Sequence, residues 1–358
     1  MAIYIRRREF ITLIACEELA WPADVTAQRS KPPRRVGVFI FSFILVFLVT
    51  RVGSAFAQSY PTRTVNIVIA FPPGGPNEGV VRSLAEKLSL SLGQAVIVEN
   101  RPGGAGGTVG TRPVASAAPD GHTLLLSPPG PLVVAPLIYK NVGYDPVKAF
   151  TPIAALFSIP QMLVVNPTVP VKSVQELVAY AKINPRKISF PSPGYGTQPH
   201  LLGEMFKLTA GIDIIHIPYK GPAAAITDLL AGQVQMYFEN IGLLLPHIET
   251  EKLRALAVSD DARDPQLPNV PTMAESGLPQ LQATYWSGIV APAGTPASIV
   301  SRLNTEINAI MKAKEMETIL AKLSARPKVG SPEDLSSFIA AETQKWTAVV
   351  NAAHIKVD

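Results

Sequence analysis

From residue 58 onward, short apolar runs rich in β-branched residues alternate with stretches whose apolar residues recur at helical spacing. The first such stretch places Val81, Leu84, Ala85, Leu88 and Leu92 on one face of a helix. We expect strands near residues 65–70, 95–99, 123–126, 162–165, 188–190, 214–217, 234–238 and 254–258. This alternation predicts an α/β fold with mostly parallel sheets and helices on both faces.

Several helix starts are marked by their own residues. Ser173 and Glu176 have the spacing of a capping box, so we expect a helix from there to about Lys182. Thr295-Pro296 and Ser331-Pro332 precede two C-terminal stretches with apolar residues at helical spacing, which predict two further helices.

The 34 prolines and 25 glycines gather directly after predicted strands, at 72–76, 102–107, 128–131 and 191–196. In an open parallel sheet, loops that leave the carboxyl ends of strands line the ligand crevice. Glycine lets backbone N–H groups approach a ligand, and a helix start favours an anion. Together the loops indicate a carboxylate site, although each loop taken alone is more typical of a simple turn.

Signatures of other functions are missing from the sequence. The glycine-rich stretch 103–110 fits neither a P-loop nor a dinucleotide fingerprint. There is no Gly-x-Ser-x-Gly elbow and no His-Glu-x-x-His pair, and none of the five histidines is four residues from another. We therefore expect no catalytic residue, no metal site and no cofactor.

The basic charge of the chain belongs to its first residues. Residues 1–57 hold 8 Lys and Arg against 4 Asp and Glu, which leaves 24 of the 32 basic and 23 of the 27 acidic residues for the rest. Residues 58–358 are thus nearly neutral, and no basic stripe indicates nucleic-acid binding.

The same segment has the pattern of an export signal. Lys31, Arg34 and Arg35 precede an apolar run at 36–50, and Ala55-Phe56-Ala57 has the small residues that a signal peptidase recognises. A run of 15 residues is shorter than the roughly 20 that span a bilayer. We predict cleavage before Gln58, and the mature chain would then hold no cysteine and no disulfide.

A second leader pattern lies upstream of the first. Arg7-Arg8-Glu9-Phe10-Ile11 is similar to a twin-arginine export motif, and Cys16 ends a stretch similar to a lipoprotein cleavage box. Glu17 and Glu18 interrupt its apolar part. A start codon placed too early and a duplicated leader both account for this arrangement.

Several short stretches, in a fixed order, resemble the Bug (TctC-like) family of periplasmic solute receptors. The resemblance covers about the whole mature chain. The matching stretches are Phe71-Pro72-Pro73-Gly74-Gly75, Glu99-Asn100-Arg101-Pro102-Gly103, Ala118-Pro119-Asp120-Gly121, Tyr144-Asp145-Pro146, Val164-Val165-Asn166-Pro167, Gly194-Tyr195-Gly196-Thr197 with His200, Pro218-Tyr219-Lys220-Gly221, Asp228-Leu229-Leu230-Ala231-Gly232-Gln233-Val234, Arg254-Ala255-Leu256-Ala257-Val258 and Ala291-Pro292-Ala293-Gly294-Thr295-Pro296.

The resemblance implies a two-domain periplasmic binding protein of the Venus-flytrap type with a central ligand cleft. Domain 1 would be residues 58–158 plus 288–358, and domain 2 would be residues 159–287. Two loops would hold a ligand carboxylate through backbone N–H groups and bridging waters, and further residues would complete the wall. The implied ligand-binding residues are Phe71, Pro73, Gly74, Gly75 and Glu78 in the first loop, Ser192, Gly194, Tyr195, Gly196 and Thr197 in the second, and Ser127, Gly130, Glu239 and Asn240 in the wall.

This chain departs from the family pattern at a few of these positions. Glu78 stands where an Asp is common, and Tyr195 where Asn or a small residue is common. Four prolines remove backbone donors, because proline has no N–H: Pro76, Pro128, Pro129 and Pro193. We expect a pocket with fewer donors and more apolar surface than a citrate receptor has.

The resemblance implies a function without catalysis. The protein would capture a small organic carboxylate in the periplasm as a monomer and deliver it to the large and small membrane subunits of a tripartite tricarboxylate transporter. Two alternatives stay open: a periplasmic sensor that presents its ligand to a signalling receptor, and an exported hydrolase. The hydrolase requires a nucleophile–base pair, which the sequence pattern does not reveal.

Overall fold

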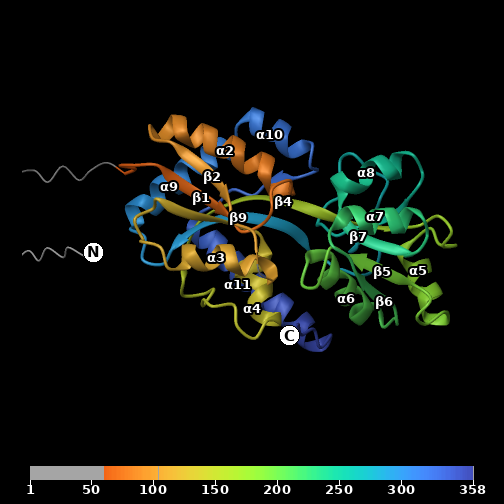
Figure 1. Cartoon of the computed structure of the whole chain (residues 1–358). Helices are drawn as coiled ribbons and strands as arrows, with labels where there is room; N and C mark the ends of the chain where they lie inside the picture. The colour runs from red at the N-terminus through yellow and green to blue at the C-terminus, as the bar shows by residue number, and fades with distance from the viewer. Residues whose placement is uncertain (1–59, 104, 358) are drawn as a thin grey trace, which may run out of the picture. The chain divides into compact units, whose positions relative to one another are not determined.

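The computed structural model describes residues 60–103 and 105–357 (Figure 1). The predicted leader, with its cleavage site before Gln58, lies outside the described residues. Within the described part, no helix is both long enough and apolar enough to cross a membrane.

Strands and helices alternate along most of the described chain. Every expected strand is present. Seven lie within about two residues of their expected bounds, whereas the strand expected at 162–165 begins twelve residues earlier, at Phe150. The strands are β1 Val65–Ile69, β2 Val96–Asn100, β3 Thr123–Ser127, β4 Phe150–Val165, β5 Ser189–Ser192, β6 Ile215–Pro218, β7 Met236–Asn240, β8 Arg254–Val258, β9 Thr284–Pro292 and β10 Arg326–Pro327. The helices are α2 Pro76–Leu92, α3 Thr108–Ala115, α4 Ala135–Ile138, α5 Val174–Ile183, α6 Gln198–Ala210, α7 Pro222–Leu230, α8 Ile241–Glu249, α9 Ala297–Met311, α10 Lys314–Ala321 and α11 Pro332–Ala352, with short turns η1 Ala105–Gly107 and η2 Gly130–Val134.

One group of elements, which we call the first lobe, is built on the strand order β2-β1-β3-β9-β4-β10. β1 pairs in parallel with β2 and β3, while β9 runs antiparallel to β3. Helices α2 and α9 pack their apolar residues on one face of this sheet, and α3, η2, α4 and α11 cover the other. Figure 1 shows the two helix layers above and below the strands.

The second lobe contains β5 to β8 and the far half of β4. β7 and β8 both pair with β4, and β5 pairs in parallel with β6. The backbone N–H of Gln235, just before β7, donates to Ser189 O of β5 at 3.0 Å. Helices α5 and α6 pack on one side of these strands and α7 and α8 on the other.

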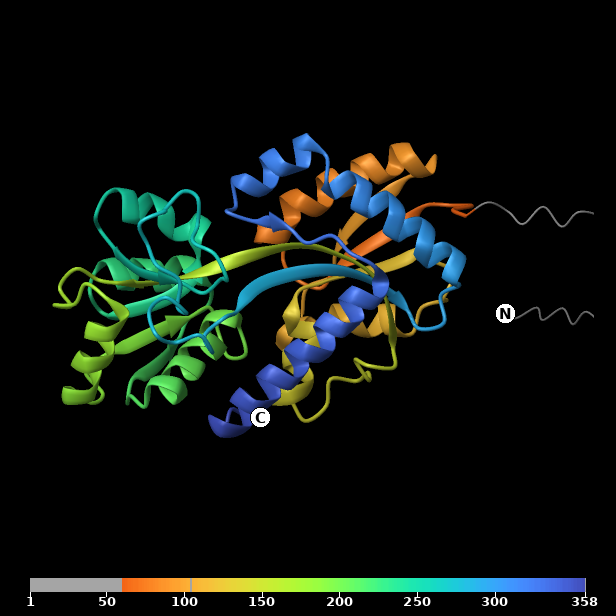
Figure 2. The same cartoon turned by 180° about the vertical axis from the view of Figure 1, so that it is seen from behind.

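β4 and β9 pass from one lobe to the other, as Figure 2 shows. β4 pairs with β9 from Phe150 to Pro160 and with β7 from Gln161 onward. Proline lacks the N–H that a ladder bond needs, so Pro160 suits the point where the partner changes. Each antiparallel pair among the described strands involves β4 or β9. The two-lobed α/β fold class is confirmed; the predicted boundaries at 158/159 and 287/288 fall within these two strands and stay predictions.

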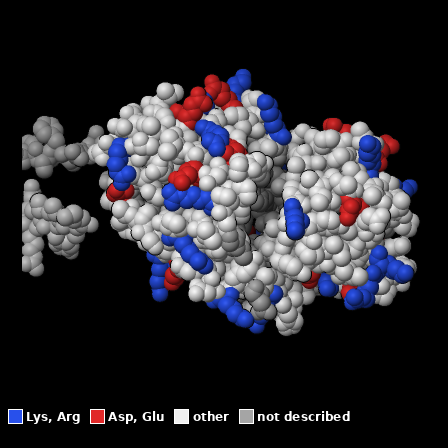
Figure 3. Space-filling view, viewed as in Figure 1, with Lys and Arg blue, Asp and Glu red and all other residues white. Residues whose placement is uncertain are grey.

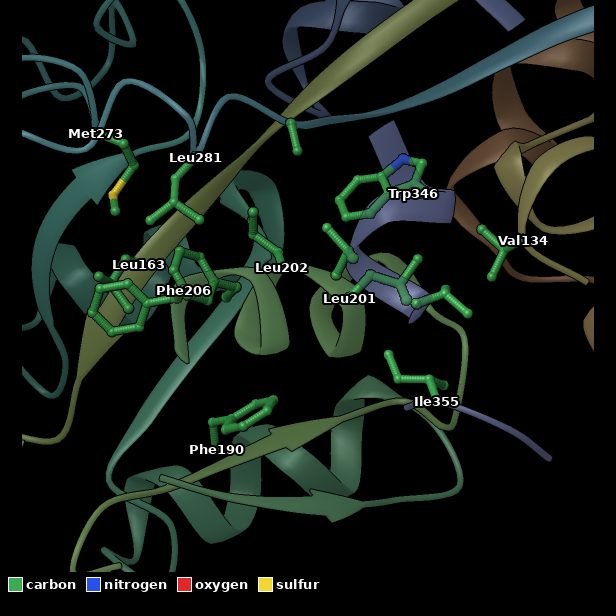
Figure 4. Packing of buried hydrophobic residues seen from close by; sticks show 14 of the residues in the cluster. Val134, Leu163, Phe190, Leu201, Leu202, Phe206, Met273, Leu281, Trp346 and Ile355 are labelled. Atoms are coloured by element: carbon green, nitrogen blue, oxygen red, sulfur yellow. The ribbon is translucent and has the colours of Figure 1, made fainter. Parts of the chain in front are cut away.

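An apolar cluster continues from the first lobe into the second. Figure 4 shows Leu201 and Leu202 of α6 near Trp346 of α11, with Phe206 deeper in the second lobe. All four side chains are fully shielded from solvent. Because this packing joins α6 to α11, the described residues share a core that neither lobe completes by itself.

This shared core predicts a single unfolding transition for the secreted protein. Replacing Leu201 by Ala deletes buried methyl groups, so we expect the free energy of unfolding to fall by about 2–5 kcal/mol. Leu90→Ala on the exposed side of α2 is the matched control, because Leu90 is 81% exposed; its effect should stay within about 0.5 kcal/mol. Scanning calorimetry measures both the number of unfolding transitions and the stability of each variant. Two separate transitions would contradict a shared core.

Candidate functional site

A furrow is visible in the surface between the two lobes (Figure 3). The first predicted loop lies between β1 and α2. Gly74 has a φ of +94°, which a residue with a Cβ rarely adopts, and Gly75 is the N-cap of α2. No side chain caps this helix. Pro76 has no N–H and Glu78 N donates to Gly75 O at 3.1 Å, so Asn77 is the first-turn residue whose N–H no described bond uses.

Two reasons could require a glycine at position 75: a positive φ, or a ligand that a Cβ would crowd. The φ of Gly75 is −76°, in the extended region open to any residue, and the positive φ belongs to Gly74. A Cβ built at either glycine meets no heavy atom within 4 Å. Crowding of a ligand is therefore the remaining reason for Gly75.

The carboxylate of Glu78 is bonded to two side chains of the protein. Its Oε1 accepts from Arg82 Nε at 2.6 Å, and its Oε2 accepts from Asn100 Nδ2 at 3.0 Å. Asn100 also donates to Phe71 O at 3.2 Å, so the carboxylate braces the first loop against β2. A direct contact between Glu78 and a ligand remains a prediction from the resemblance.

Two of the predicted wall residues lie close to the first loop. The ring of Phe71 approaches Gly130, since a Cβ built there would lie 3.6 Å from Phe71 Cζ. Ser127 is fully buried at the end of β3, and its hydroxyl donates to Pro128 O at 2.9 Å. Pro73 is exposed on the loop itself.

The second loop, between β5 and α6, is closed by bonds among its own residues. Gly194 N donates to Ser192 Oγ at 3.2 Å, and Thr197 Oγ1 donates to Gly194 O at 2.7 Å. Gly196 N donates to His200 Nδ1 at 3.1 Å. The expectation was that backbone N–H groups of this loop hold the ligand; those of Gly194 and Gly196 are already used within the protein.

Two stacked histidines contact residues of this loop. The rings of His200 and His216 lie 4.0 Å apart between centroids and are tilted by 31°. Tyr195, which is 52% exposed, presents its ring edge-on to both. Sequence spacing could not reveal this pair, because its members come from α6 and β6 and meet only in the folded protein.

Burial keeps both histidines neutral. It lowers the pKa of His200 to about 3, with help from the charge of His216, and lowers the pKa of His216 to about 4, with help from Lys207. Nδ1 of His200 accepts the Gly196 N–H, which requires that nitrogen to be unprotonated.

The structure does contain a serine–histidine contact that the sequence did not reveal. Ser192 Oγ lies 2.6 Å from His216 Nε2. Ser192 is fully buried, however, and its Oγ also lies 3.0 Å from Gly194 O. A buried hydroxyl beside a weakly basic imidazole is suited to bracing a loop rather than to attacking a substrate.

A polar network joins the first loop to β9. Asn77, the residue after Pro76 in α2, donates from Nδ2 to the Tyr285 hydroxyl at 2.8 Å, and its Oδ1 accepts from Ser287 Oγ at 2.6 Å. Burial raises the pKa of Tyr285 to about 12; the bonds to Asn77 and Ser287 oppose this rise, and the charge of Glu239 adds to it. Glu239 therefore lies close enough to this network to act on it.

Glu239 and Asn240 end β7 at the same place. Tyr237 donates from its hydroxyl to Glu239 Oε2 at 2.6 Å, and Asn240 N donates to Glu239 Oε1 at 2.8 Å. Burial raises the pKa of Glu239 to about 7, against the lowering effect of these two bonds. Gln161 Nε2 donates to Asn240 Oδ1 at 2.5 Å. The bonds of both wall residues predicted from β7 therefore lie within the second lobe.

The chain is similar to known proteins over most of its length. The family described as "Tripartite tricarboxylate transporter family receptor" matches residues 80–355. Protein BugT of Bordetella pertussis is 39% identical over 302 residues, which are 84% of this chain and 92% of that protein. These findings confirm the resemblance read from the sequence.

Solved structures agree with the family. Rpa4515 of R. palustris, solved with adipate, is 35% identical with a TM-score of 0.73 and covers 83% of this chain and 99% of its own. The periplasmic binding protein BugD is 37% identical with a TM-score of 0.70, covering 83% and 99%. MatC of Rhodopseudomonas palustris, with bound malate, is 33% identical with a TM-score of 0.69, covering 81% and 100%.

The buried histidine pair predicts a loss of stability in acid. Both pKa values are lowered in the folded protein, so unfolding takes up protons as the pH falls from the ordinary histidine value of about 6.5 toward 4. The raised pKa of Glu239 acts in the opposite sense between pH 7 and about 4.5, but it is one group against two. We expect the melting temperature to fall between pH 7 and pH 4.

The variant His216→Gln tests whether the histidine pair causes this loss of stability in acid. A Gln amide can still reach Ser192 but does not titrate. The melting temperature of this variant should depend less on pH than that of the unchanged protein. His354→Gln, at an exposed position after α11, is the control and should keep the original dependence. Equal pH dependence in all three proteins would contradict the assignment.

Proposed function

The chain belongs to the tripartite tricarboxylate transporter family of receptors, and we propose that it captures a small organic carboxylate in the cleft between its lobes. One observation carries this proposal: over more than four fifths of the chain, it is similar to receptors solved with adipate and with malate. We also propose that it delivers this ligand to the large and small membrane subunits of a tripartite transporter, which the family match supports. The protein would act as a monomer.

The first loop is the better placed of the two for the anion. The uncapped start of α2 offers the N–H of Asn77 and the positive end of the helix dipole, and the space beside Gly75 is open. The second loop has used the N–H groups of Gly194, Gly196 and Thr197, so Tyr195 is the residue between them that is left for a ligand. We therefore propose that the carboxylate binds at Gly74, Gly75 and the first turn of α2.

Export would bring this site to its ligand. We propose that the segment before Gln58 directs the chain to the periplasm and is removed there. Closure of residues 159–287 onto residues 58–158 and 288–358 would then trap the ligand, with β4 and β9 as the hinge. The affinity would reflect contacts made only in the closed state.

Binding without turnover separates this proposal from the hydrolase alternative. In a thermal-shift screen of mono- and dicarboxylic acids, amino acids and aromatic acids, at least one acid should raise the melting temperature by mass action. Prolonged incubation of that acid with pure protein should leave it unchanged by mass spectrometry. Chemical conversion of the acid would contradict the receptor assignment.

Gly75→Val tests the anion site. Its φ of −76° and the empty space around it allow a valine in the ligand-free protein, at a cost of about 0.5–1 kcal/mol for the lost N-cap glycine. The added methyl groups would occupy the place of the carboxylate, so we expect affinity to fall about tenfold or more. Calorimetric titration beside a melting curve measures both effects.

Gly79→Val is the matched control for this substitution. Gly79 lies one turn further along α2, is exposed, and a Cβ built there also meets nothing within 4 Å. This variant should bind as the unchanged protein does. Equal affinity in both variants would place the carboxylate away from Gly75.

A further inference from the structure

The second loop touches the first lobe through the backbone of Gly196. A Cβ built on Gly196 would lie 2.4 Å from Ile138 Cδ1 and 3.3 Å from Val134 Cγ1. Val134 and Ile138 belong to η2 and α4 of the first lobe, whereas Gly196 lies between β5 and α6 of the second. Its φ of +74° favours glycine as well. We call Val134 and Ile138 the seat of the second loop.

The seat is fixed within the first lobe. Ile138 O accepts from Val357 N at 3.1 Å, and Pro131 O accepts from the Tyr144 hydroxyl at 2.8 Å. Val134 and Ile138 are 3% and 4% exposed, and both belong to the apolar cluster that the two lobes share (Figure 4). Because Ile138 is branched at Cβ and closely packed, its Cδ1 has little room to turn away from an added methyl group.

The segment that carries the seat also contacts the first loop. This segment, residues 130–138, begins at Gly130, where an added Cβ would lie 3.6 Å from Phe71 Cζ. Phe71 directly precedes the prolines and glycines of the first loop. One short segment therefore lies against both ligand loops, and it sets the distance between them.

Bonds within the second loop make it move as a unit. Gly196 N donates to His200 Nδ1 at 3.1 Å, and Thr197 N donates to Gly194 O at 3.3 Å. Tyr195, the residue that this loop leaves for a ligand, lies between the bonded residues. A displacement of Gly196 from the seat would therefore displace Tyr195 as well.

We propose that Gly196 is a positioning residue of the binding site, which acts by lying directly against the seat. This contact would hold Tyr195 at the separation from the first loop that a carboxylate bound at Gly75 requires. A side chain at position 196 would push the two loops apart. This inference rests on the proposed function.

The ligand-free protein provides the first test. Gly196→Ala places a methyl group against Ile138, so its melting temperature should fall by roughly 2–4 °C more than that of Gly211→Ala. Gly211→Ala is the matched control, because Gly211 has a φ of +61° and a Cβ built there meets nothing within 4 Å. When Ile138→Ala removes Cδ1, this additional fall should disappear. An additional fall of the same size with and without Ile138 would overturn the seat.

Affinity separates a positioning role from an effect on stability alone. The mono- and dicarboxylic acids, amino acids and aromatic acids of the thermal-shift screen, with adipate and malate among them, are titrated by calorimetry well below each melting temperature. For the acid that the unchanged protein binds most tightly, Gly196→Ala should weaken binding about tenfold or more. The Gly211→Ala control should change it by less than about threefold.

Rescue is the result that only the seat predicts. Ile138→Ala by itself should weaken binding, because it trims the surface that positions the loop. Added to Gly196→Ala, the same substitution should strengthen binding, because it makes room for the new methyl group. A double variant that binds no more tightly than Gly196→Ala would overturn the positioning role.

Failure of the proposed function has a different signature in these titrations. If an acid binds the unchanged protein and Gly196→Ala binds it equally well, the carboxylate receptor stands and the positioning role is wrong. If no acid binds the unchanged protein, the proposed function fails, and the role of Gly196 in binding fails with it.

Discussion

The change of partner along β4 is the constraint on which the site depends. Up to Pro160 this strand belongs to the sheet of the first lobe, and from Gln161 onward it belongs to the sheet of the second. Because β9 begins at the same crossing, two adjacent antiparallel strands carry the chain between the lobes. This arrangement brings Asn77 of α2 together with Tyr285 and Ser287 of β9, which are far apart from it in the sequence, in one polar network.

Apolar packing and polar contacts lie on different sides of this crossing. On one side, Trp286 of β9 and Trp346 of α11 are fully buried and both donate to Glu342, at 3.3 and 3.0 Å. That side joins the lobes by a shared core. The β7 end at Glu239 instead holds buried polar groups that bond to one another within the second lobe.

The strands and helices with a clear hydrophobic periodicity were predicted from the sequence. The two strands that run through both lobes were mostly missed. The strands with short β-branched runs were found to within two residues, whereas only the last four residues of the 16-residue β4 and none of β9 were expected. Pro152 and Pro160 interrupt the first part of β4, and register shifts follow near Pro152 and Ala155. The Ser173 cap was confirmed, but Glu176 accepts from Lys172 N, and the full capping box is at Ser331 and Asp334. For the site, glycine loops were visible in the sequence; Asn77, Gln161, His216 and Tyr285 were not, because their roles arise from contacts across the fold.

The most direct test of the account is the identity of the compound that the protein carries from the cell. Protein purified rapidly under native conditions is denatured, and the released small molecules are identified by mass spectrometry. The account predicts an organic acid in stoichiometric amount, with at least one carboxylate. A stoichiometric ligand without a carboxyl group, such as a sugar or a nucleobase, would contradict the central claim.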